Sequence, residues 1–156
     1  VERPNDWERQ LHAQSPTQAQ SIMRSEQRLA FWDAYLKRVP GENRHGDANK
    51  LPNRWHVLED VGLIVSVYLI SGGVGIYVRG PWKCNNEDVR GRLQPLASTL
   101  EQRLGAEMGN RPDYFFNNWR TGDFKDESQR GEMIDWLAAQ MDLYETTLRD
   151  AIDEGH

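Results

Sequence analysis

Apolar and polar residues alternate most clearly between residues 54 and 80, where the β-branched residues of the chain are densest. Within this stretch, residues 63–70 and 74–78 place apolar side chains at every second position, which is the pattern of an extended strand. Ser71-Gly72-Gly73 lies between them and supplies the left-handed backbone positions of a tight hairpin. Residues 55–58 have the composition of a further strand. The pattern therefore predicts an antiparallel meander of three strands.

A helical spacing of apolar residues defines the segment upstream of this meander. Ser15-Pro16-Thr17 is typical of a helix start, and Pro40-Gly41 is typical of a helix end. We therefore predict a helix over residues 17–39, preceded by an irregular lead-in or linker over residues 1–16 and followed by a loop over residues 41–53. The apolar positions of this helix are Ile22, Leu29, Trp32, Leu36 and Val39, with Phe31 and Tyr35 beside them.

Two more helical stripes follow the meander, separated by an aromatic segment. The first stripe runs to a stop signal at Gly105, and Pro95 inside it predicts either a kink or two short helices that meet there. Residues 113–121 predict a fourth strand, and residues 127–153 predict a last helix with Trp136 beside its apolar face. The apolar positions of the first stripe are Val89, Leu93, Leu96, Leu100 and Leu104, and those of the second are Met133, Leu137, Met141, Tyr144, Leu148 and Ile152.

The order of these elements is α-β-β-β-α-β-α. It predicts an α+β fold class, with an antiparallel sheet of about four strands covered by helices on one face. A chain of 156 residues is long enough to bury one ordinary core, so residues 17–156 are predicted to form a single domain.

Composition narrows the class of protein. Charged residues make up 28% and hydrophobic residues 38%, as in ordinary globular domains. No apolar run approaches the roughly 20 residues that cross a membrane, so no membrane partner is expected. Cys84 is the single cysteine, which excludes an internal disulfide and favours a reducing, cytoplasmic compartment. The chain begins with Val1, and we interpret it as part of a longer protein.

The charge is unevenly distributed along the chain. Residues 122–156 carry 10 acidic and 3 basic side chains, whereas the preceding part is slightly basic, and the formal net charge is −5. The net negative charge of the protein repels phosphates, which disfavours non-specific binding of nucleic acid. The same net charge still allows one locally basic surface. The acidic last helix is interpreted as a solvated face.

One motif suggests catalysis. Asp113 after Pro112, followed by Asp123 and Lys125, fits the carboxylate-and-lysine pattern with which restriction-type nucleases hold Mg²⁺ and activate water. That chemistry requires both acids at the rims of paired strands, whereas Asp123 and Lys125 lie in a polar stretch that predicts a turn. We therefore treat a Mg²⁺-dependent nuclease as a remote alternative and predict no catalytic residue.

Other reactive side chains form no recognisable motif. His45 and His56 are the only central histidines, and neither they nor Cys84 stand at the spacing of a structural zinc site. Cys84 has no histidine and acid that can be nominated as partners. The sequence therefore predicts neither a metal site nor a cofactor.

A cluster of basic and aromatic residues suggests binding instead. Arg54 and Trp55 flank the long loop, while Arg79, Trp82 and Lys83 follow the third strand. Cations beside exposed aromatic rings are what backbone contacts and base stacking require. These five residues are therefore the predicted nucleic-acid-binding site. The alternative is that the tryptophans pack in the core and the cations solvate loops.

The sequence also resembles an uncharacterised prokaryotic domain family of unknown function. The residues that carry the resemblance are Arg3-Pro4 with Trp7, Gln27-Arg28-Leu29 with Phe31-Trp32, the glycine-containing strand pair from Val61 to Tyr77, Leu104-Gly105, and Ile134-Asp135-Trp136-Leu137. Members of that family lie C-terminal to restriction-endonuclease-like domains in proteins connected with DNA cleavage or defence. The resemblance implies no catalytic residue, and it implies a nuclease-like domain as a neighbour.

These observations predict a non-catalytic accessory domain of a nuclease- or defence-associated protein, contributing recognition of DNA or of a partner protein. The competing prediction is a structural or dimerising domain with no nucleic-acid role, joined as a homodimer through the aromatic faces of its first and last helices.

Overall fold

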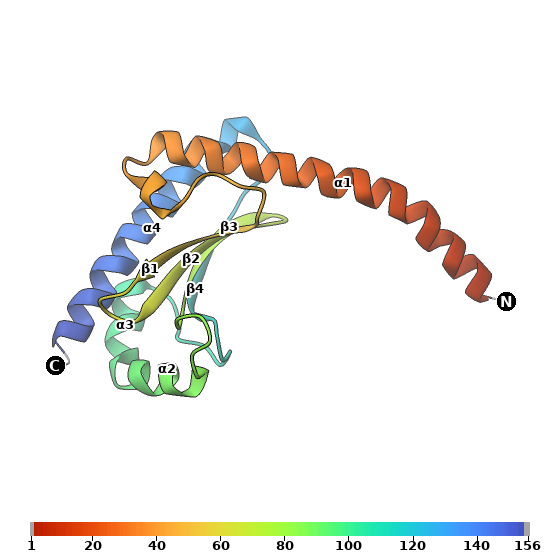
Figure 1. The fold of residues 1–156 in the computed structure, drawn as a ribbon. Helices are drawn as coiled ribbons and strands as arrows, with labels where there is room; N and C mark the ends of the chain where they lie inside the picture. Colours follow the sequence, from red (N-terminus) through yellow and green to blue (C-terminus); the bar gives the residue numbers. More distant parts are fainter. Residues whose placement is uncertain (1, 155–156) are drawn as a thin grey trace.

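The computed structural model describes the backbone of residues 2–154, and the side chains of residue 19 and residues 21–154. It contains an open four-stranded antiparallel sheet, and the last helix, residues 127–154, lies across one face of that sheet (Figure 1). The α+β fold class and the α-β-β-β-α-β-α order predicted from the sequence are confirmed. No helix in the described part of the chain has the length and the apolar composition needed to cross a membrane.

The sheet is a simple meander in which each strand pairs with its neighbour in sequence. Its strands are β1 (Asn53–Leu58), β2 (Leu63–Ile70), β3 (Gly73–Arg79) and β4 (Phe115–Thr121). The hairpin between β2 and β3 turns at Gly72, whose φ of 90° lies in the region that favours glycine. The three-strand meander and the fourth aromatic strand are thus confirmed, with ends shifted by one or two residues.

Four helices and two short 3-10 turns complete the fold within residues 2–154. The helices are α1 (Glu2–Arg38), α2 (Asn86–Leu93), α3 (Ala97–Leu104) and α4 (Glu127–Glu154), and the turns are η1 (Glu42–His45) and η2 (Gln94–Leu96). Near Pro95 the chain forms two short helices and not one kinked helix, which is one of the two predicted outcomes. Gly105 ends α3 in the left-handed conformation at φ 69°, as its position after the last apolar residue predicted.

The first helix differs from the prediction. It begins at Glu2 and passes through Pro16. The predicted irregular lead-in over residues 1–16 is therefore wrong, because the backbone of residues 2–16 is helical. Glu, Arg and Gln each occur twice among residues 1–16, and together with Leu11 and Ala13 they favour helix strongly enough to outweigh the hydrogen bond that proline cannot donate. Ile22 is 63% exposed, and Phe31 is the first buried residue among the α1 side chains that the structure describes. Figure 1 shows α1 running past the end of the sheet.

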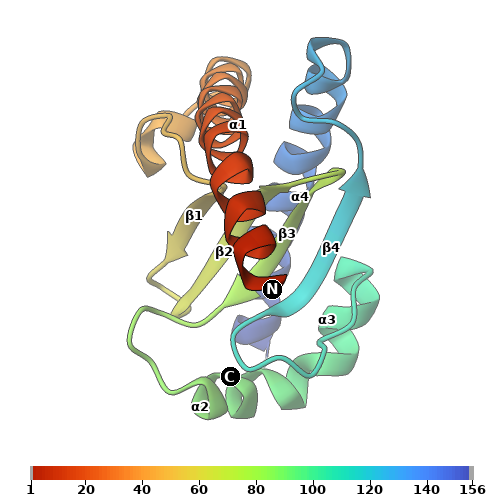
Figure 2. The ribbon, with the colours of Figure 1, turned by 90° about the vertical axis from the view of Figure 1, so that its right-hand side faces the viewer.

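The core lies between the sheet and α4. Helix α4 packs across β2 and β3, and α1 and α3 pack against α4 (Figure 2). The largest fully buried side chains include Trp32, Tyr35, Tyr144, Phe31 and Phe115. We call the opposite side of the sheet, which faces away from α4, the open face. In Figure 2 the open face is turned toward the viewer and α4 lies behind the sheet.

Candidate functional site

The register of the strands arranges the open face in rows. Trp55, Ser66 and Tyr77 are cross-strand neighbours in one row. The next row contains Asn53 and Tyr68, followed by Gly75 and Trp119. Because side chains alternate between the two faces of a strand, these residues all point away from α4. The open face therefore carries aromatic rings from each of its four strands or the loops that adjoin them.

Three of the predicted site residues meet at one end of this face. The rings of Trp55 and Trp82 contact edge to face, with their centroids 5.5 Å apart. The Arg79 guanidinium lies over the Trp82 ring, 4.1 Å from its centroid, which is a favourable cation–π geometry. Trp82 remains 51% exposed, so part of its surface is available for stacking. This end of the open face combines an accessible ring with a fixed cation.

Lys83 is held beside Trp82 by a tight turn. The Cys84 backbone N–H donates to the Pro81 carbonyl at 3.2 Å, which closes the turn. Lys83 has a φ of 63°, in the left-handed region where a residue with a side chain is strained and glycine is not. The Lys83 side chain is exposed. The turn therefore presents an exposed lysine on a strained backbone next to the Trp82 ring.

The centre of the open face is a group of three tyrosines. Tyr77 and Tyr114 are stacked with their centroids 4.1 Å apart, and Tyr68 packs beside both rings. The hydroxyls of Tyr68 and Tyr114 both donate to Asn117 Oδ1, at 2.5 and 3.0 Å. Burial raises the pKa of Tyr68 above its ordinary value, so its hydroxyl stays a donor at physiological pH. Asn117 thus fixes two rings in one orientation.

A glycine makes room for this arrangement. A Cβ atom on Gly75 would lie 2.2 Å from the Tyr68 ring, so the ring rests directly on the Gly75 backbone. Glycine in the middle of a strand is otherwise unfavourable, because it orders a flexible backbone and packs no side chain. Gly75 therefore serves the placement of Tyr68.

A hollow of about 460 Å³ lies next to the tyrosines. Its volume falls within the range of small-molecule sites. Trp119, which is 54% exposed, forms part of its wall, and Arg111 lies over the Tyr114 ring at 5.4 Å. The hollow is lined among others by Tyr68, Ile70, Met108, Arg111, Tyr114 and Trp119. It offers flat apolar rings together with one guanidinium and the Asn117 amide.

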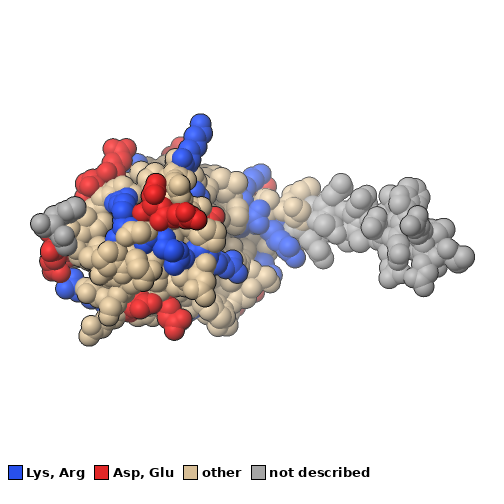
Figure 3. All heavy atoms as spheres, turned by 90° about the horizontal axis from the view of Figure 1, so that it is seen from below, with Lys and Arg blue, Asp and Glu red and all other residues tan. Residues whose placement is uncertain are grey.

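Charge on the surface is mixed. Figure 3 shows one side of the molecule, on which basic side chains form a band toward the described part of α1 and acidic side chains lie on both sides of it. The cations nearest the open-face rings are Arg79, Lys83 and Arg111, while Glu107 lines the same hollow as Arg111. Glu107 therefore offsets part of the positive charge of Arg111 at this hollow.

Arg54 does not join the other predicted residues, which corrects the expectation that all five lie together. Residues in β1 alternate, so Arg54 points to the α4 side while Trp55 points to the open face. Arg54 is 4% exposed, and its Nη2 atom lies 2.8 Å from Glu42 Oε2. It also donates to the backbone carbonyls of Asp47 and Gly46. This guanidinium neutralises a buried carboxylate and is not available to an external ligand.

The nuclease pattern is not assembled either. Asp113 precedes β4, whereas Asp123 and Lys125 follow it. A strand of this length separates its ends by roughly 20 Å. Asp123 Oδ1 instead accepts the backbone N–H of Lys125 at 3.0 Å, as expected for a local turn. These three side chains do not converge on one metal ion.

The aromatic faces proposed for a homodimer are also occupied. Phe31, Trp32 and Tyr35 of α1 and Tyr144 of α4 have no exposed surface, because they pack inside the same chain. A dimer through these rings would require the core to open.

Sequence reasoning missed the tyrosine group. The strand alternation already placed Tyr68 and Tyr77 opposite the apolar face of their strands. The contribution of Tyr114, Asn117 and Trp119 depends on the pairing of β4 with β3, which no sequence signal specified.

Comparisons of the chain with protein-family models, with curated proteins and with solved structures gave no match. The class of protein is therefore defined here by its own geometry: an α+β domain with an open four-stranded antiparallel sheet and an aromatic face.

Proposed function

We propose that this domain is a recognition module that binds single-stranded nucleic acid on the open face of its sheet. The observation that carries the proposal is a pair of exposed rings at the margins of that face, Trp82 at 51% and Trp119 at 54% exposed, with the half-buried Tyr114 ring stacked on the buried Tyr77 ring between them. Unpaired bases stack on such rings, with about 1–3 kcal/mol contributed per base. Cations at Arg79, Lys83 and Arg111 are placed to contact the phosphates.

A single strand fits this face better than a duplex does. In a duplex the base faces are stacked on one another and are hidden from flat aromatic rings, whereas an unpaired strand can present them. The hollow beside Trp119 also has room for a splayed base, and the Asn117 amide and the Arg111 guanidinium offer polar partners for its edge. Duplex binding would depend mainly on phosphate contacts, for which this acidic chain is poorly suited.

The proposed biological setting is that of an accessory domain in a nuclease- or defence-associated protein, with a nuclease-like domain as neighbour. This setting rests on the resemblance described under Sequence analysis. The separation of Asp113 from Asp123 and Lys125 by β4 supports only the non-catalytic part of this proposal, because those three side chains do not share one metal ion.

The direct test is a titration of a labelled oligothymidine strand with the purified chain, followed by fluorescence anisotropy at two salt concentrations. A duplex of the same length is titrated in parallel. We expect the single strand to bind more tightly than the duplex. We also expect binding to weaken at the higher salt concentration, because phosphate contacts release counterions.

Variants locate the surface. Replacing Trp82 or Trp119 with Ala is expected to weaken binding by about tenfold each, since each removes a stacking platform. Lys83→Gly is expected to preserve the fold, because glycine suits the left-handed backbone there. It is also expected to reduce the slope of the logarithm of the binding constant against the logarithm of salt concentration by about one. Lys37→Ala is the matched control, because Lys37 is exposed on α1 and pairs with Asp33 away from the open face.

Three results would contradict the proposal. They are the absence of strand binding at low salt, binding that is unchanged in the Trp82 and Trp119 variants, and equal losses in the Lys37 control. Cleavage of the strand in the presence of Mg²⁺ would instead identify a nuclease. Capture of an extended peptide by the same face, without strand binding, would identify a protein-recognition module.

A further inference from the structure

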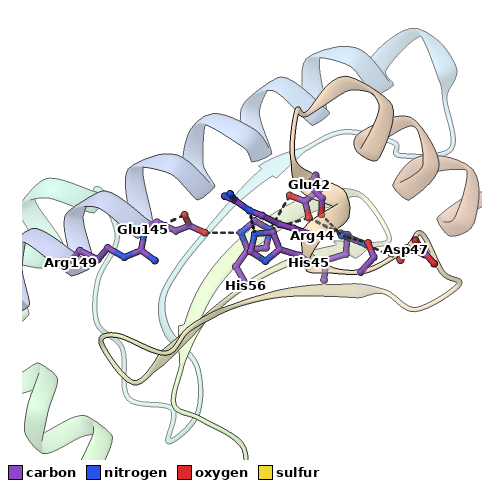
Figure 4. Close-up of polar contacts among 9 residues, drawn as sticks. Glu42, Arg44, His45, Asp47, His56, Glu145 and Arg149 are labelled. Carbon is purple, nitrogen blue, oxygen red and sulfur yellow. Dashed lines mark hydrogen bonds and ion pairs between the residues drawn. The ribbon is translucent and has the colours of Figure 1, made fainter.

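A second polar site lies on the opposite side of β1 from the aromatic face. It is assembled from η1 and β1, which are near one another in sequence, and from the distant helix α4 (Figure 4). His45 ends η1, His56 lies in β1 on the α4 side, and Glu145 projects from α4. One ligand atom from each of these three side chains lies within 4.8 Å of the other two.

His56 is the centre of the group. Its Nδ1 atom lies 2.7 Å from Glu145 Oε1, and its Nε2 atom lies 2.9 Å from Glu42 Oε1. The His45 ring is stacked on the His56 ring with the centroids 3.5 Å apart. His56 is buried, while His45 and Glu145 are half-buried and reach the surface. The site is therefore rooted in the core and open on one side.

Glu42 supports His56 from behind. It is buried and is paired with Arg54 at 2.8 Å, so its position is fixed and its charge is compensated. When Glu42 accepts the Nε2–H of His56, the imidazole is oriented with its Nδ1 atom toward Glu145. A carboxylate that orients a histidine in this way is the usual outer partner of a histidine metal ligand.

We propose that His45, His56 and Glu145 bind a divalent transition-metal ion of the zinc type. Two imidazole nitrogens and one carboxylate oxygen form a donor set that suits Zn²⁺ and Co²⁺, and the absence of thiolate among the three separates the site from a structural cysteine centre. A cavity of about 160 Å³, lined by these residues together with Tyr35 and Asp142, adjoins the group. It leaves room for a fourth ligand such as water.

Binding rearranges a few contacts. The ion takes the place of the proton that His56 Nδ1 shares with Glu145, and that proton leaves to solvent. The His45 ring turns out of its stack on His56 and releases the hydrogen bond that exposed Arg44 donates to its Nε2 atom at 3.2 Å. Gly46, at φ 113°, follows His45 directly, and its conformational freedom eases this movement. The Arg149 Nη1 atom lies 3.8 Å from Glu145 Oε2, the carboxylate oxygen that does not contact His56, and this ion pair is retained.

The site is independent of the proposed nucleic-acid surface, because His56 and Trp55 point to opposite faces of β1.

The test of the metal site uses Co²⁺ as a spectroscopic probe. The untagged chain is titrated with Co²⁺, and visible absorption is expected to rise to saturation at one ion per chain, with the intensity of a tetrahedral or five-coordinate centre. Addition of Zn²⁺ is expected to abolish the absorption by displacement. Zn²⁺ is also expected to raise the thermal unfolding temperature, because it binds the folded chain.

Two ligand variants and one control identify the residues. Glu145→Gln keeps the shape of the side chain, and His45→Ala removes a half-buried ring, so both are expected to fold and to weaken Co²⁺ binding at least tenfold. Asp150→Asn, an exposed position on the same helix, is expected to bind as the unaltered chain does. Circular dichroism and thermal unfolding establish that each variant is folded.

Two outcomes would overturn the assignment. One is a chain that shows no saturable Co²⁺ absorption and no Zn²⁺-dependent change in unfolding temperature. The other is binding that is equally strong in Glu145→Gln and His45→Ala, which would place the ion on other groups of the chain. If His45→Ala fails to fold, Glu145→Gln and the effect of Zn²⁺ on its unfolding temperature decide the question.

Discussion

Individual buried side chains show how much a single hydrogen bond matters in this core. Tyr35 and Tyr144 are both fully buried. The Tyr144 hydroxyl donates to the Phe116 carbonyl at 2.6 Å, and Phe116 has a φ of 53°, near an irregularity in the pairing of β3 and β4. The Tyr35 hydroxyl has no hydrogen-bond partner among the described residues. The same chemical group is therefore satisfied in one place and orphaned in the other.

This contrast gives a matched pair of substitutions. Tyr144→Phe is expected to lower the free energy of unfolding by about 1–2 kcal/mol, because it leaves the Phe116 carbonyl buried and unpaired. Tyr35→Phe is expected to leave stability unchanged or to raise it, since it removes an unpaired hydroxyl. Urea denaturation of both variants measures the difference, and equal losses in the two would contradict the account.

Two ion pairs give a similar comparison for charged side chains, since the pair of Arg54 and Glu42 is buried and the pair of Arg38 and Asp135 is exposed. Arg54→Leu leaves the buried Glu42 carboxylate with His56 Nε2 as its remaining charged partner, and is expected to destabilise the fold by about 3–5 kcal/mol. Arg38→Leu removes an exposed pair with Asp135, 2.6 Å apart, and is expected to change stability little. Thermal and urea unfolding of the two variants measure this. A small loss in Arg54→Leu would show that Glu42 finds water or another partner.

At the scale of elements, two glycines have opposite consequences. Gly75 in β3 lies under the Tyr68 ring, whereas an added Cβ on Gly91 in α2 meets no atom within 4 Å. Strand β3 therefore needs its glycine for packing, and α2 tolerates its glycine at the expense of helix propensity.

Alanine substitutions distinguish these roles. Gly75→Ala is expected to destabilise the chain by about 1–3 kcal/mol through overpacking, and to weaken strand binding by displacing Tyr68. Gly91→Ala is expected to stabilise α2 by about 0.5–1 kcal/mol and to leave binding unchanged. Denaturation and the anisotropy titration together provide the measurement. A neutral Gly75→Ala would mean that the Tyr68 ring is not held against the sheet.

For the whole molecule, buried phenols link stability to alkaline pH. Burial raises the pKa of Tyr35, Tyr68 and Tyr144, so the folded state favours their neutral forms. Their contribution to stability is fully present below about pH 10, the ordinary pKa of tyrosine, and is lost as the pH rises further.

An alkaline titration followed by tyrosinate absorbance tests this. We expect these three tyrosines to resist ionisation above about pH 10 and then to ionise together with unfolding, as monitored by circular dichroism. Ionisation of every tyrosine near its ordinary pKa, without loss of structure, would contradict the burial of these rings.

The strands and helices were largely predictable because their signals are local. The alternation over residues 63–70 and 74–78, the hairpin at Gly72 and the stop at Gly105 each express a backbone preference that acts over a few residues. The start of α1 was missed because helix propensity summed over many residues outweighed a single proline. The separation of Arg54 from Trp55 also followed from strand alternation, so the sequence contained enough information to divide the predicted site.

The fold class, the order of the elements and the face to which each strand residue points could be predicted from the sequence, since these follow from periodicity and local conformational preference. Which faces meet depends on the packing of whole elements in the folded chain. The pairing of β4 with β3 brings Trp119 and Asn117 to Tyr68, and the packing of α4 against the sheet brings Glu145 to His56. Contacts between residues distant in sequence depend on how whole elements pack, and no short stretch of the chain carries that information.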